Sequence, residues 1–167
     1  SSKYLNTGFP GNTIAGSSLH MGIGLLATQT GSAAYKQALG VYFNPTAFFA
    51  IYVRKNDAVP NAHFGAYATS NAGDVVNTSS LAVGNIVAAY PSVFRNGVAT
   101  GVDATASATF PNSQPFFVFA TNNGTGSALE HTDARLGWYS IGETMTSGQV
   151  EDFNDALVAL YSALSRT

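Results

Sequence analysis

The sequence contains no cysteine among its 167 residues. Disulfides, thiolate metal sites, thiol redox chemistry and cysteine nucleophiles are therefore excluded. A chain of this length buries roughly two thirds of the surface that it exposes when unfolded, so a hydrophobic core is enough to hold one domain together. We therefore expect a single domain over residues 1–167 that needs no cross-link.

Charged residues are scarce as well. They make up 10% of the chain, against about 25% in an average soluble domain. Lys and Arg number 7 against 9 Asp and Glu, which gives a net charge of −2. No basic stripe is available to neutralise phosphates, so we expect no nucleic-acid partner. The surface must be covered mainly by Ser, Thr, Asn and Gly, as is common in secreted β-proteins and virion proteins.

Long apolar runs are also missing. The stretch 47–53 is among the longest, and it is far shorter than the ~20 residues needed to cross a bilayer. Residues 1–5 do not show the basic region and apolar core of a signal peptide, and the chain does not begin with methionine. We expect no membrane span, and we interpret the chain as a processed product or the C-terminal part of a longer one.

What the sequence does contain is a series of short β-branched or aromatic runs separated by Gly, Asn, Ser and Pro clusters. This pattern is typical of an all-β sandwich, and the runs follow one another too closely for crossover helices. The predicted strands are 3–6, 19–28, 48–54, 62–69, 86–94, 116–121 and 134–141. Segments 71–80 and 122–127 are predicted to be polar loops.

Two local patterns make the strand prediction more specific. Within 19–25 the large apolar residues alternate, so that one face packs inward while His20, Gly22 and Gly24 line the other. Glycines on that face permit close approach by another part of the chain or by a ligand. Asn96-Gly97 predicts a tight hairpin, because both central residues of a type I′ turn need positive φ.

The C-terminal segment changes from a period of two to a helical period. Its apolar residues at helical spacing are Val150, Phe153, Leu157, Leu160, Tyr161 and Leu164. Thr146 and Gln149 have the spacing of a capping box. We expect an amphipathic helix over about 147–165 that lies on the sandwich. The predicted fold is therefore mostly β: an antiparallel two-sheet jelly-roll sandwich with one C-terminal α-helix.

Catalytic signatures are missing. A glycosidase needs two carboxyls about 5 to 10 Å apart, but the only glutamates are Glu130, Glu143 and Glu151, and no predicted strand carries acidic residues at alternate positions. The acidic segment 130–133 precedes a strand and is interpreted as a solvated turn. The chain has no Gly-x-Ser-x-Gly elbow and no complete dinucleotide-binding glycine motif. We expect no enzymatic activity and no organic cofactor.

Metal sites have little support. The three histidines, His20, His63 and His131, are too widely spaced to predict a zinc site. Calcium is the one metal with candidate ligands, because lectin-like sandwiches often bind it through Asp, Asn and carbonyl oxygens. These candidates are Asp74, Asp103 and Asp133, in segments rich in Gly and Asn. Isolated Asp residues in turns more often cap their own backbone.

Sugar binding by a non-catalytic domain needs aromatic platforms beside amide or hydroxyl groups, because a pyranose has an apolar face ringed by hydroxyls. The candidate carbohydrate-binding residues are Tyr35, Asn61, Tyr67, Asn71, Asn122 and Asn123. Most of the 11 Phe and 8 Tyr must lie in the core. The single tryptophan, Trp138, is also expected inside rather than on a platform.

Four stretches carry a family resemblance. They are Tyr-Leu-Asn-Thr-Gly-Phe at 4–9, the strand 18–22, the hairpin 93–98, and the ending 135–142 followed by Met145-Thr146 and the helix. Together they resemble the concanavalin A-like, laminin-G-like domains of bacteriophage tail and other virion proteins. The ending, with Tyr-Ser-Ile-Gly before a Thr-capped helix, is the most distinctive. Family members usually carry a Gly-Asp-Gly strand before the first motif, and this chain begins at that motif.

The resemblance implies an exposed module on the surface of an extracellular virus particle, where it decorates capsid or tail and binds host-surface carbohydrate. It transfers no site residue, because the family shares no fixed catalytic or sugar-binding set. Expected partners are copies of the chain, other virion proteins and cell-surface polysaccharide. The alternative is a purely structural assembly or cement protein, and a glycan-cleaving enzyme is the least favoured hypothesis. Low surface charge suits both a sugar-binding face and a protein-packing face.

Overall fold

The computed structural model describes residues 3–13, 18–27, 36–44, 47–54, 61–66, 70–76, 80–87, 90–102 and 113–164. The strands are β1 (Leu5–Pro10), β2 (Leu19–Ala27), β3 (Lys36–Asn44), β4 (Ala47–Arg54), β5 (Asn61–Ala66), β6 (Ser70–Val76), β7 (Ser80–Val87), β8 (Tyr90–Arg95), β9 (Val98–Val102), β10 (Pro115–Val118), β11 (Thr121–Asn122), β12 (Ala128–Leu129) and β13 (Arg135–Glu143). The helix α1 spans Ser147–Ala163.

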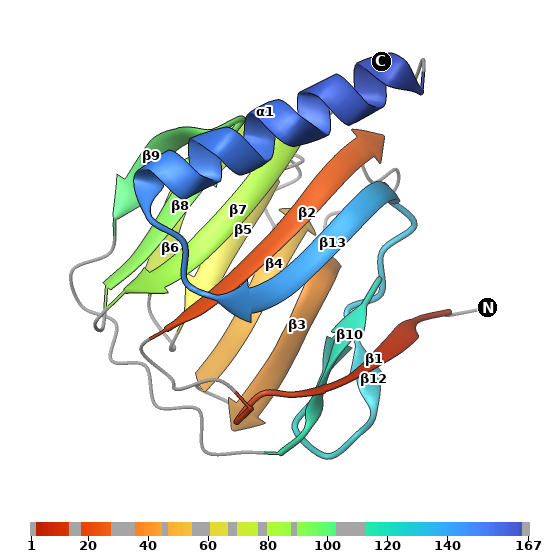
Figure 1. Ribbon diagram of the computed structural model, residues 1–167. Coiled ribbons are helices and arrows are strands. Elements are labelled where there is room, and N and C mark those ends of the chain that lie inside the picture. The colour runs from red at the N-terminus through yellow and green to blue at the C-terminus, as the bar shows by residue number, and fades with distance from the viewer. Residues whose placement is uncertain are drawn as a thin grey trace.

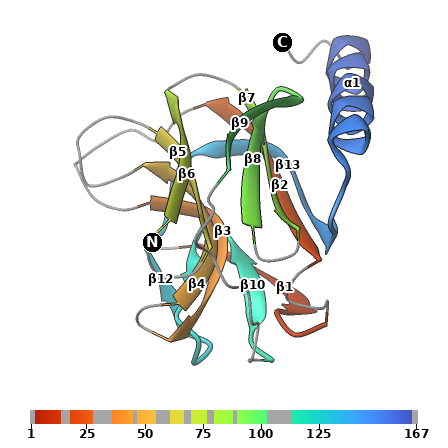
Figure 2. The same ribbon diagram turned by 90° about the vertical axis from the view of Figure 1, so that its left-hand side faces the viewer.

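The strands form two sheets that face each other (Figure 1). Sheet A has the order β1-β10-β3-β4-β5-β6, with β11 and β12 attached beside β3, and sheet B has the order β13-β2-β7-β8-β9. The helix α1 lies on the side of sheet B that is turned away from sheet A, as Figure 2 shows. The predicted mostly β sandwich with one C-terminal helix is therefore confirmed.

The core lies between the sheets and is built from alternate positions of the strands. Sheet B contributes Leu19, Met21, Ile23 and Leu25 of β2, and sheet A contributes Leu39, Val41, Phe49, Ile51, Val53, Phe116 and Val118. Because neighbouring residues of a strand point to opposite faces, the residues between these positions lie on the outer faces of the two sheets. Those outer faces carry the candidate functional groups.

Two predicted local structures are confirmed. β8 and β9 are joined by Asn96, with φ of 49°, and Gly97, with φ of 79°. At the start of α1, the Thr146 hydroxyl accepts a hydrogen bond from the backbone N–H of Gln149 at 3.2 Å, and the Gln149 side-chain oxygen accepts one from the Thr146 N–H at 2.8 Å. The capping box therefore forms as the sequence indicates.

The capping box gives a first testable prediction. Thr146→Ala is expected to lower the free energy of unfolding by about 1 kcal/mol, because it removes an acceptor from the first turn of α1. The measurement is the urea midpoint of the two proteins. Ser162→Ala, at an exposed position near the other end of α1, is the control and should change stability by no more than about 0.5 kcal/mol. Equal midpoints for the two variants would contradict the prediction.

Three strand predictions need correction. β3 is missing from the predicted strands, although it lies in the middle of sheet A. The predicted polar loop 71–80 contains most of β6 and the first residue of β7, and the predicted strand 86–94 is in fact the end of β7 and most of β8. Small and polar residues in these strands hide the alternation that marks a strand. Within the ranges given above, no helix has the length and apolar character of a membrane span.

Candidate functional site

A break in the alternation of β3 directs Gln37 to the outer face of sheet A. Gln37 pairs with Tyr52 of β4, and Leu39 pairs with Ile51, so Ala38 has no cross-strand partner of its own. Ala38 and Leu39 both belong to the core. This is a β-bulge, which reorients the side chains beside it. Gln37 therefore lies on the outer face instead of sharing the inward face of Leu39.

Four polar side chains meet at this bulge. Gln37 is fully buried, and its Nε2 donates hydrogen bonds to the Tyr42 hydroxyl at 3.1 Å and to the Glu130 Oε2. The Tyr42 hydroxyl also donates to Glu130 Oε2 at 3.1 Å, and the hydroxyl oxygens of Tyr42 and Tyr52 lie 3.5 Å apart. We call Gln37, Tyr42, Tyr52 and Glu130 the polar cluster. A Cβ added at Gly40 would lie 2.8 Å from Gln37 Oε1, so the cluster requires glycine there.

Glu130 is held over sheet A by backbone as well as side-chain contacts. Its carbonyl oxygen accepts a hydrogen bond from the Gln37 backbone N–H at 2.9 Å. Its φ of 52° lies in the left-handed region, which is uncommon for a residue with a side chain. Burial raises the pKa of the Glu130 carboxyl, while hydrogen bonds from Tyr42 and Gln37 and the charge of Lys36 act in the opposite direction. The prediction of a solvated turn is therefore wrong for Glu130, because its carboxylate is half-buried against the sheet.

An aromatic surface adjoins the polar cluster. The ring of Tyr4, which is 44% exposed, stacks on the buried ring of Phe117 with centroids 4.4 Å apart. The ring of His131 lies 6.1 Å from that of Tyr4. We call Tyr4, Phe117 and His131 the aromatic platform. Phe117 is the cross-strand neighbour of Gly40, so the platform and the polar cluster occupy adjoining parts of one outer face.

Within the part of the chain that the structure describes, the polar cluster and the aromatic platform each contain a buried polar atom with no hydrogen-bond partner. These atoms are Gln37 Oε1 in the polar cluster and His131 Nδ1 in the aromatic platform. Leaving a buried polar atom without a partner costs about 1–3 kcal/mol, and such atoms are uncommon in folded proteins.

Burial raises the pKa of the Tyr42 hydroxyl, as it does that of the Glu130 carboxyl. The Tyr42 hydroxyl therefore stays protonated and able to donate a hydrogen bond. The outer face of sheet A thus combines an exposed ring with unsatisfied polar groups.

Asn122 and Asn123 have structural roles in the loop after β11. The side chain of Asn122 is fully buried, with Nδ2 donating to the Pro115 carbonyl at 2.8 Å and Oδ1 accepting from two backbone N–H groups of the loop. Asn123 Oδ1 accepts hydrogen bonds from the backbone N–H groups of Thr125 and Ser127. These bonds hold the loop, and they leave Asn122 no group to offer a sugar.

Of the other predicted sugar-binding residues, the structure places Asn61 and Asn71 by their positions in strands. Asn61 lies in β5 opposite Val76, and Asn71 lies in β6 opposite Gly65. Tyr35 and Tyr67 fall outside the described residues. A binding role for these four positions stays a prediction.

The predicted calcium ligands are Asp74, Asp103 and Asp133. Asp74 lies in β6 rather than in a loop, and Asp133 is exposed, while Asp103 falls outside the described residues. Among the residues with assigned positions, no three His, Asp or Glu side chains are grouped as a metal site would require.

The residues that do converge were not predicted from the sequence. Glu130 follows Gln37 by 93 positions, and no local pattern joins two residues so far apart. Gly40 is the one signal that was available, because a glycine inside a strand often marks a bulge or a close approach.

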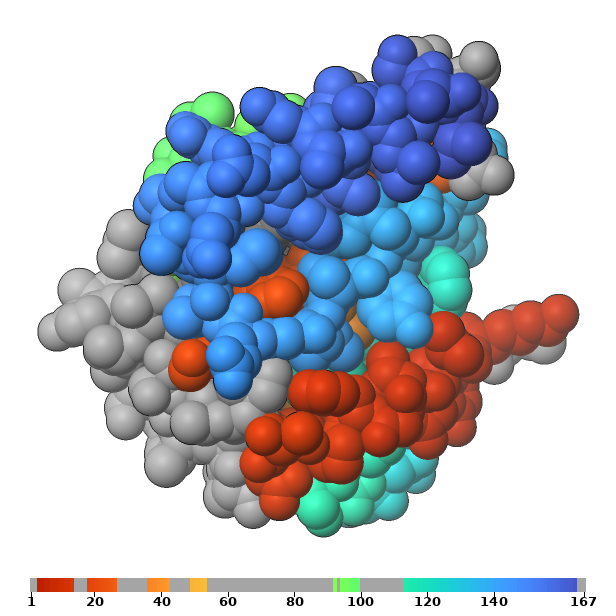
Figure 3. All heavy atoms as spheres, in the orientation of Figure 1, coloured from red at the N-terminus to blue at the C-terminus, as the bar shows by residue number. Residues whose placement is uncertain are grey.

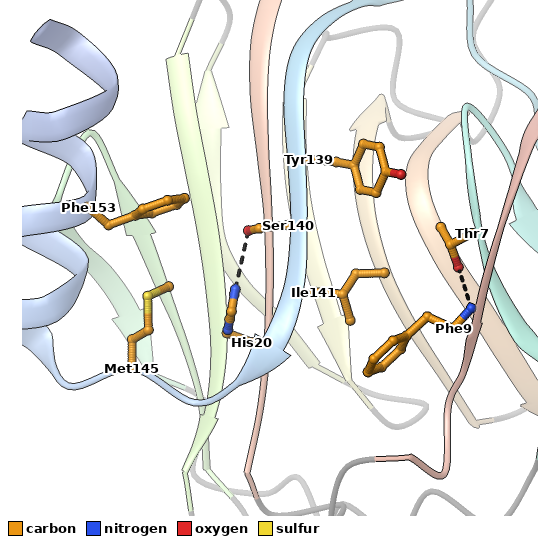
Figure 4. A pocket seen from close by; sticks show the side chains of 8 residues that line it. All are labelled: Thr7, Phe9, His20, Tyr139, Ser140, Ile141, Met145 and Phe153. Carbon is orange, nitrogen blue, oxygen red and sulfur yellow. Dashed lines mark hydrogen bonds between the residues drawn. The ribbon is translucent and has the colours of Figure 1, made fainter. Parts of the chain in front are cut away.

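A hollow extends from α1 across β13 to β1, on the face of the molecule that Figure 3 shows. It has a volume of about 550 Å³ and is lined by Thr7, Phe9, His20, Tyr139, Ser140, Ile141, Met145 and Phe153. β13 runs through its middle. Tyr139 and Ile141 point toward Thr7 and Phe9 of β1, whereas His20 and Ser140 point toward α1 (Figure 4).

Three polar side chains of this hollow, those of His20, Ser140 and Thr7, are bonded to one another or to the backbone. His20 Nε2 lies 3.2 Å from the Ser140 hydroxyl oxygen, and His20 Nδ1 lies 2.6 Å from the Glu143 carbonyl oxygen, to which it donates. The Thr7 hydroxyl donates to the Phe116 carbonyl at 2.8 Å and accepts from the Phe9 N–H at 3.1 Å. These bonds fix the segment that leads into α1.

His20 makes the stability of the fold depend on pH. Burial lowers its pKa below the ordinary value of 6.5, and the hydrogen bond to the Glu143 carbonyl only partly opposes this. The unfolded chain therefore binds more protons than the folded one at pH values just below 6.5, so stability falls as the pH drops through this window. Urea midpoints at pH 7.5 and 5.5 measure the loss, which should be smaller in His20→Gln. The same loss in both proteins would contradict the prediction.

No protein-family model and no curated protein matches the sequence. Solved structures do match its fold. The CBM40 of the Ruminococcus gnavus IT-sialidase, bound to α2,3-sialyllactose, superposes with a TM-score of 0.67 at 8% identity over 92% of each chain. The heptameric SAP-like pentraxin of Limulus polyphemus gives a TM-score of 0.60 at 14% identity over 86% of this chain and 70% of its own.

Domain 4 of AbnA, an extracellular arabinanase of Geobacillus stearothermophilus solved with arabinotriose, gives a TM-score of 0.61 at 12% identity. The match covers 87% of this chain and 70% of that one. At such identities the likeness concerns the fold alone. The chain thus has the concanavalin A-like lectin fold, a two-sheet β-sandwich, here with a C-terminal helix on sheet B.

Proposed function

We propose that this chain is a non-catalytic carbohydrate-binding module whose sugar site is the outer face of sheet A. The observation that carries the proposal is the position of the exposed Tyr4 ring beside the polar cluster of Gln37, Tyr42, Tyr52 and Glu130. A pyranose ring packs its apolar face on an aromatic ring and exchanges hydrogen bonds through its hydroxyls. Both kinds of group are present within one surface.

Two of the structurally similar domains were solved with saccharides, sialyllactose in one and arabinotriose in the other. This supports a saccharide as the ligand class. A binding role is also favoured over catalysis, because Glu130 is the sole carboxylate of the polar cluster, and acid–base cleavage of a glycosidic bond normally needs a second one.

The proposal includes a place of action, the surface of a bacteriophage particle, as a tail or capsid-decorating module. It is supported by the resemblance of segments 4–9, 18–22, 93–98 and 135–142 to virion domains, and by the low charge of the chain. The partner in this setting is the cell-surface polysaccharide of the host, reached by several copies of the module on one particle.

The test is binding of the purified protein to a glycan array that includes bacterial surface polysaccharides, followed by calorimetry on the hits. Tyr4→Ala should weaken binding about tenfold, which corresponds to about 1.4 kcal/mol and lies within the range for stacking on an aromatic ring. Tyr139→Ala is the matched control, because Tyr139 is similarly exposed at 42% but lies in the hollow beside sheet B. Absence of binding to every glycan by the folded protein would overturn the proposal.

A structural role in particle assembly is the second candidate. One observation favours it: Val158 and Leu160 in the second half of α1, and Leu164 directly after its last residue, are 54%, 50% and 51% exposed. Apolar side chains that remain half exposed on a helix are suited to packing against a neighbouring copy. Analytical ultracentrifugation of the protein and of Leu160→Ser with Leu164→Ser tests this, since assembly through α1 predicts an oligomer that the double variant dissociates.

A further inference from the structure

We infer that the sheet A site selects a neutral saccharide, rich in hydroxyl donors, over an anionic one. This inference rests on the proposed function, because it concerns the ligand class of the same site. It is carried by the balance of donors and acceptors in the polar cluster and by the sign of the charge that faces the ligand.

The donors of the cluster are used internally. The Gln37 amide has two N–H groups, and Nε2 donates to both Tyr42 and Glu130. The Tyr42 hydroxyl has one hydrogen, and it is directed at Glu130 Oε2. The cluster therefore has few N–H or O–H groups left to donate hydrogen bonds to an incoming ligand.

Acceptors remain available. Glu130 Oε1 takes part in none of these hydrogen bonds, because both donors bind Oε2. Gln37 Oε1 also lacks a partner, but Gln37 is fully buried, so this oxygen is out of reach of a ligand. A ligand that bonds to Glu130 Oε1 must bring its own hydrogens, which the hydroxyl groups of a saccharide can do. Hydrogen bonds from hydroxyls to a carboxylate are charge-assisted and about twice as strong as those between neutral groups.

The same carboxylate disfavours an anionic sugar. A uronate or sialate group brought onto the cluster would face Glu130 in partly desolvated surroundings, where two like charges repel strongly. Lys36, the first residue of β3, is a basic residue at this end of the sheet. The charge of Lys36 already acts on Glu130, so its attraction for a second anion is offset by that carboxylate.

The experiment compares each saccharide that binds with a counterpart that differs only in charge. A neutral hit is oxidised at C6 to the uronate, and an anionic hit is reduced at its carboxyl to the alcohol. We expect the neutral member of each pair to bind at least tenfold more tightly by calorimetry. Glu130→Gln should weaken binding of the neutral member about tenfold and narrow the difference within the pair. Glu143→Gln, at an exposed position of β13, is the control. It should change neither the affinity for the neutral member nor the difference in affinity within the pair.

The outcomes separate the inference from the proposal on which it rests. Tighter binding of the anionic member, lost in Lys36→Gln, would overturn the inference and leave carbohydrate binding intact. An unchanged preference in Glu130→Gln would also overturn it, because the selectivity would then not come from the carboxylate. If no saccharide binds the folded protein, the proposed function falls and the inference with it.

Discussion

Replacing Gly24 by alanine is expected to destabilise the protein by about 2–3 kcal/mol, the upper part of the range for overpacking a well-packed site. Gly24 lies on the outer face of β2, directly beneath Trp138. A Cβ added there would lie 2.5 Å from Trp138 Cδ1 and 2.7 Å from the Tyr161 hydroxyl oxygen. Real side chains do not approach so closely, so the indole ring and the helix above it must move.

Trp138 and the residues of α1 around it form the contact between α1 and sheet B. The ring of Trp138 packs edge to face against Phe153 of α1, with centroids 5.3 Å apart and planes at 81°. Val150 at the start of α1 is fully buried beside them. Displacing Trp138 therefore weakens the docking of the whole helix, while the core between the two sheets is left unchanged.

Tryptophan fluorescence measures this effect directly, because Trp138 is the single tryptophan of the chain. In Gly24→Ala the emission should shift to longer wavelength and the urea midpoint should fall. Gly148→Ala is the matched control, since a Cβ added at that helical position meets nothing within 4 Å. It should be neutral or stabilising by up to about 1 kcal/mol. A Gly24→Ala protein with the emission and midpoint of the parent would show that the helix does not depend on this contact.

Gly22 and Gly24 of β2 show which part of the packing could be predicted from the sequence. Alternation within 19–25 correctly predicted which side chains enter the core and that glycines on the other face permit a close approach. The sequence did not identify the approaching group. Gly22 and Gly24 accommodate Trp138 from β13, and this contact is made by residues more than 100 positions away. The expectation that Trp138 is not a sugar platform agrees with its place beneath α1.

The same limit explains the missed site. Capping boxes, Asn-Gly turns and alternating strands are local patterns, because the interactions that create them join residues a few positions apart. The polar cluster depends on a bulge at Ala38 and on Glu130 reaching β3 from the loop after β12. Gly40 is the one local signal of the bulge, and the pairing of β3 with β10 has none, so Glu130 was interpreted as part of a solvated turn. In the sequence, Tyr4 was identified only as part of the motif at 4–9. Its role as an exposed ring depends on its stacking on Phe117, which no local pattern predicts.

Gly40→Ala is expected to abolish sugar binding and to destabilise the fold by about 2 kcal/mol. A Cβ at this position would lie 2.7 Å from the Cβ of Ala50 on β4 and 2.8 Å from Gln37 Oε1. The first contact forces β3 and β4 apart, and the second expels the Gln37 side chain from its place beside Glu130. Calorimetry with a saccharide hit and urea unfolding measure the two effects in one protein.

Gln37→Met separates binding from stability, because it removes the amide without adding an atom that clashes. The substitution removes the two hydrogen bonds that Gln37 Nε2 donates to Tyr42 and Glu130. It also removes the buried Gln37 Oε1, which has no hydrogen-bond partner. These contributions are similar in size and opposite in sign, so the free energy of unfolding should change by no more than about 1 kcal/mol. Sugar binding should nevertheless fall at least tenfold, because Glu130 is then no longer held in place. If Gln37→Met binds sugar as the parent protein does, the cluster is a structural feature of sheet A and the sugar site lies elsewhere.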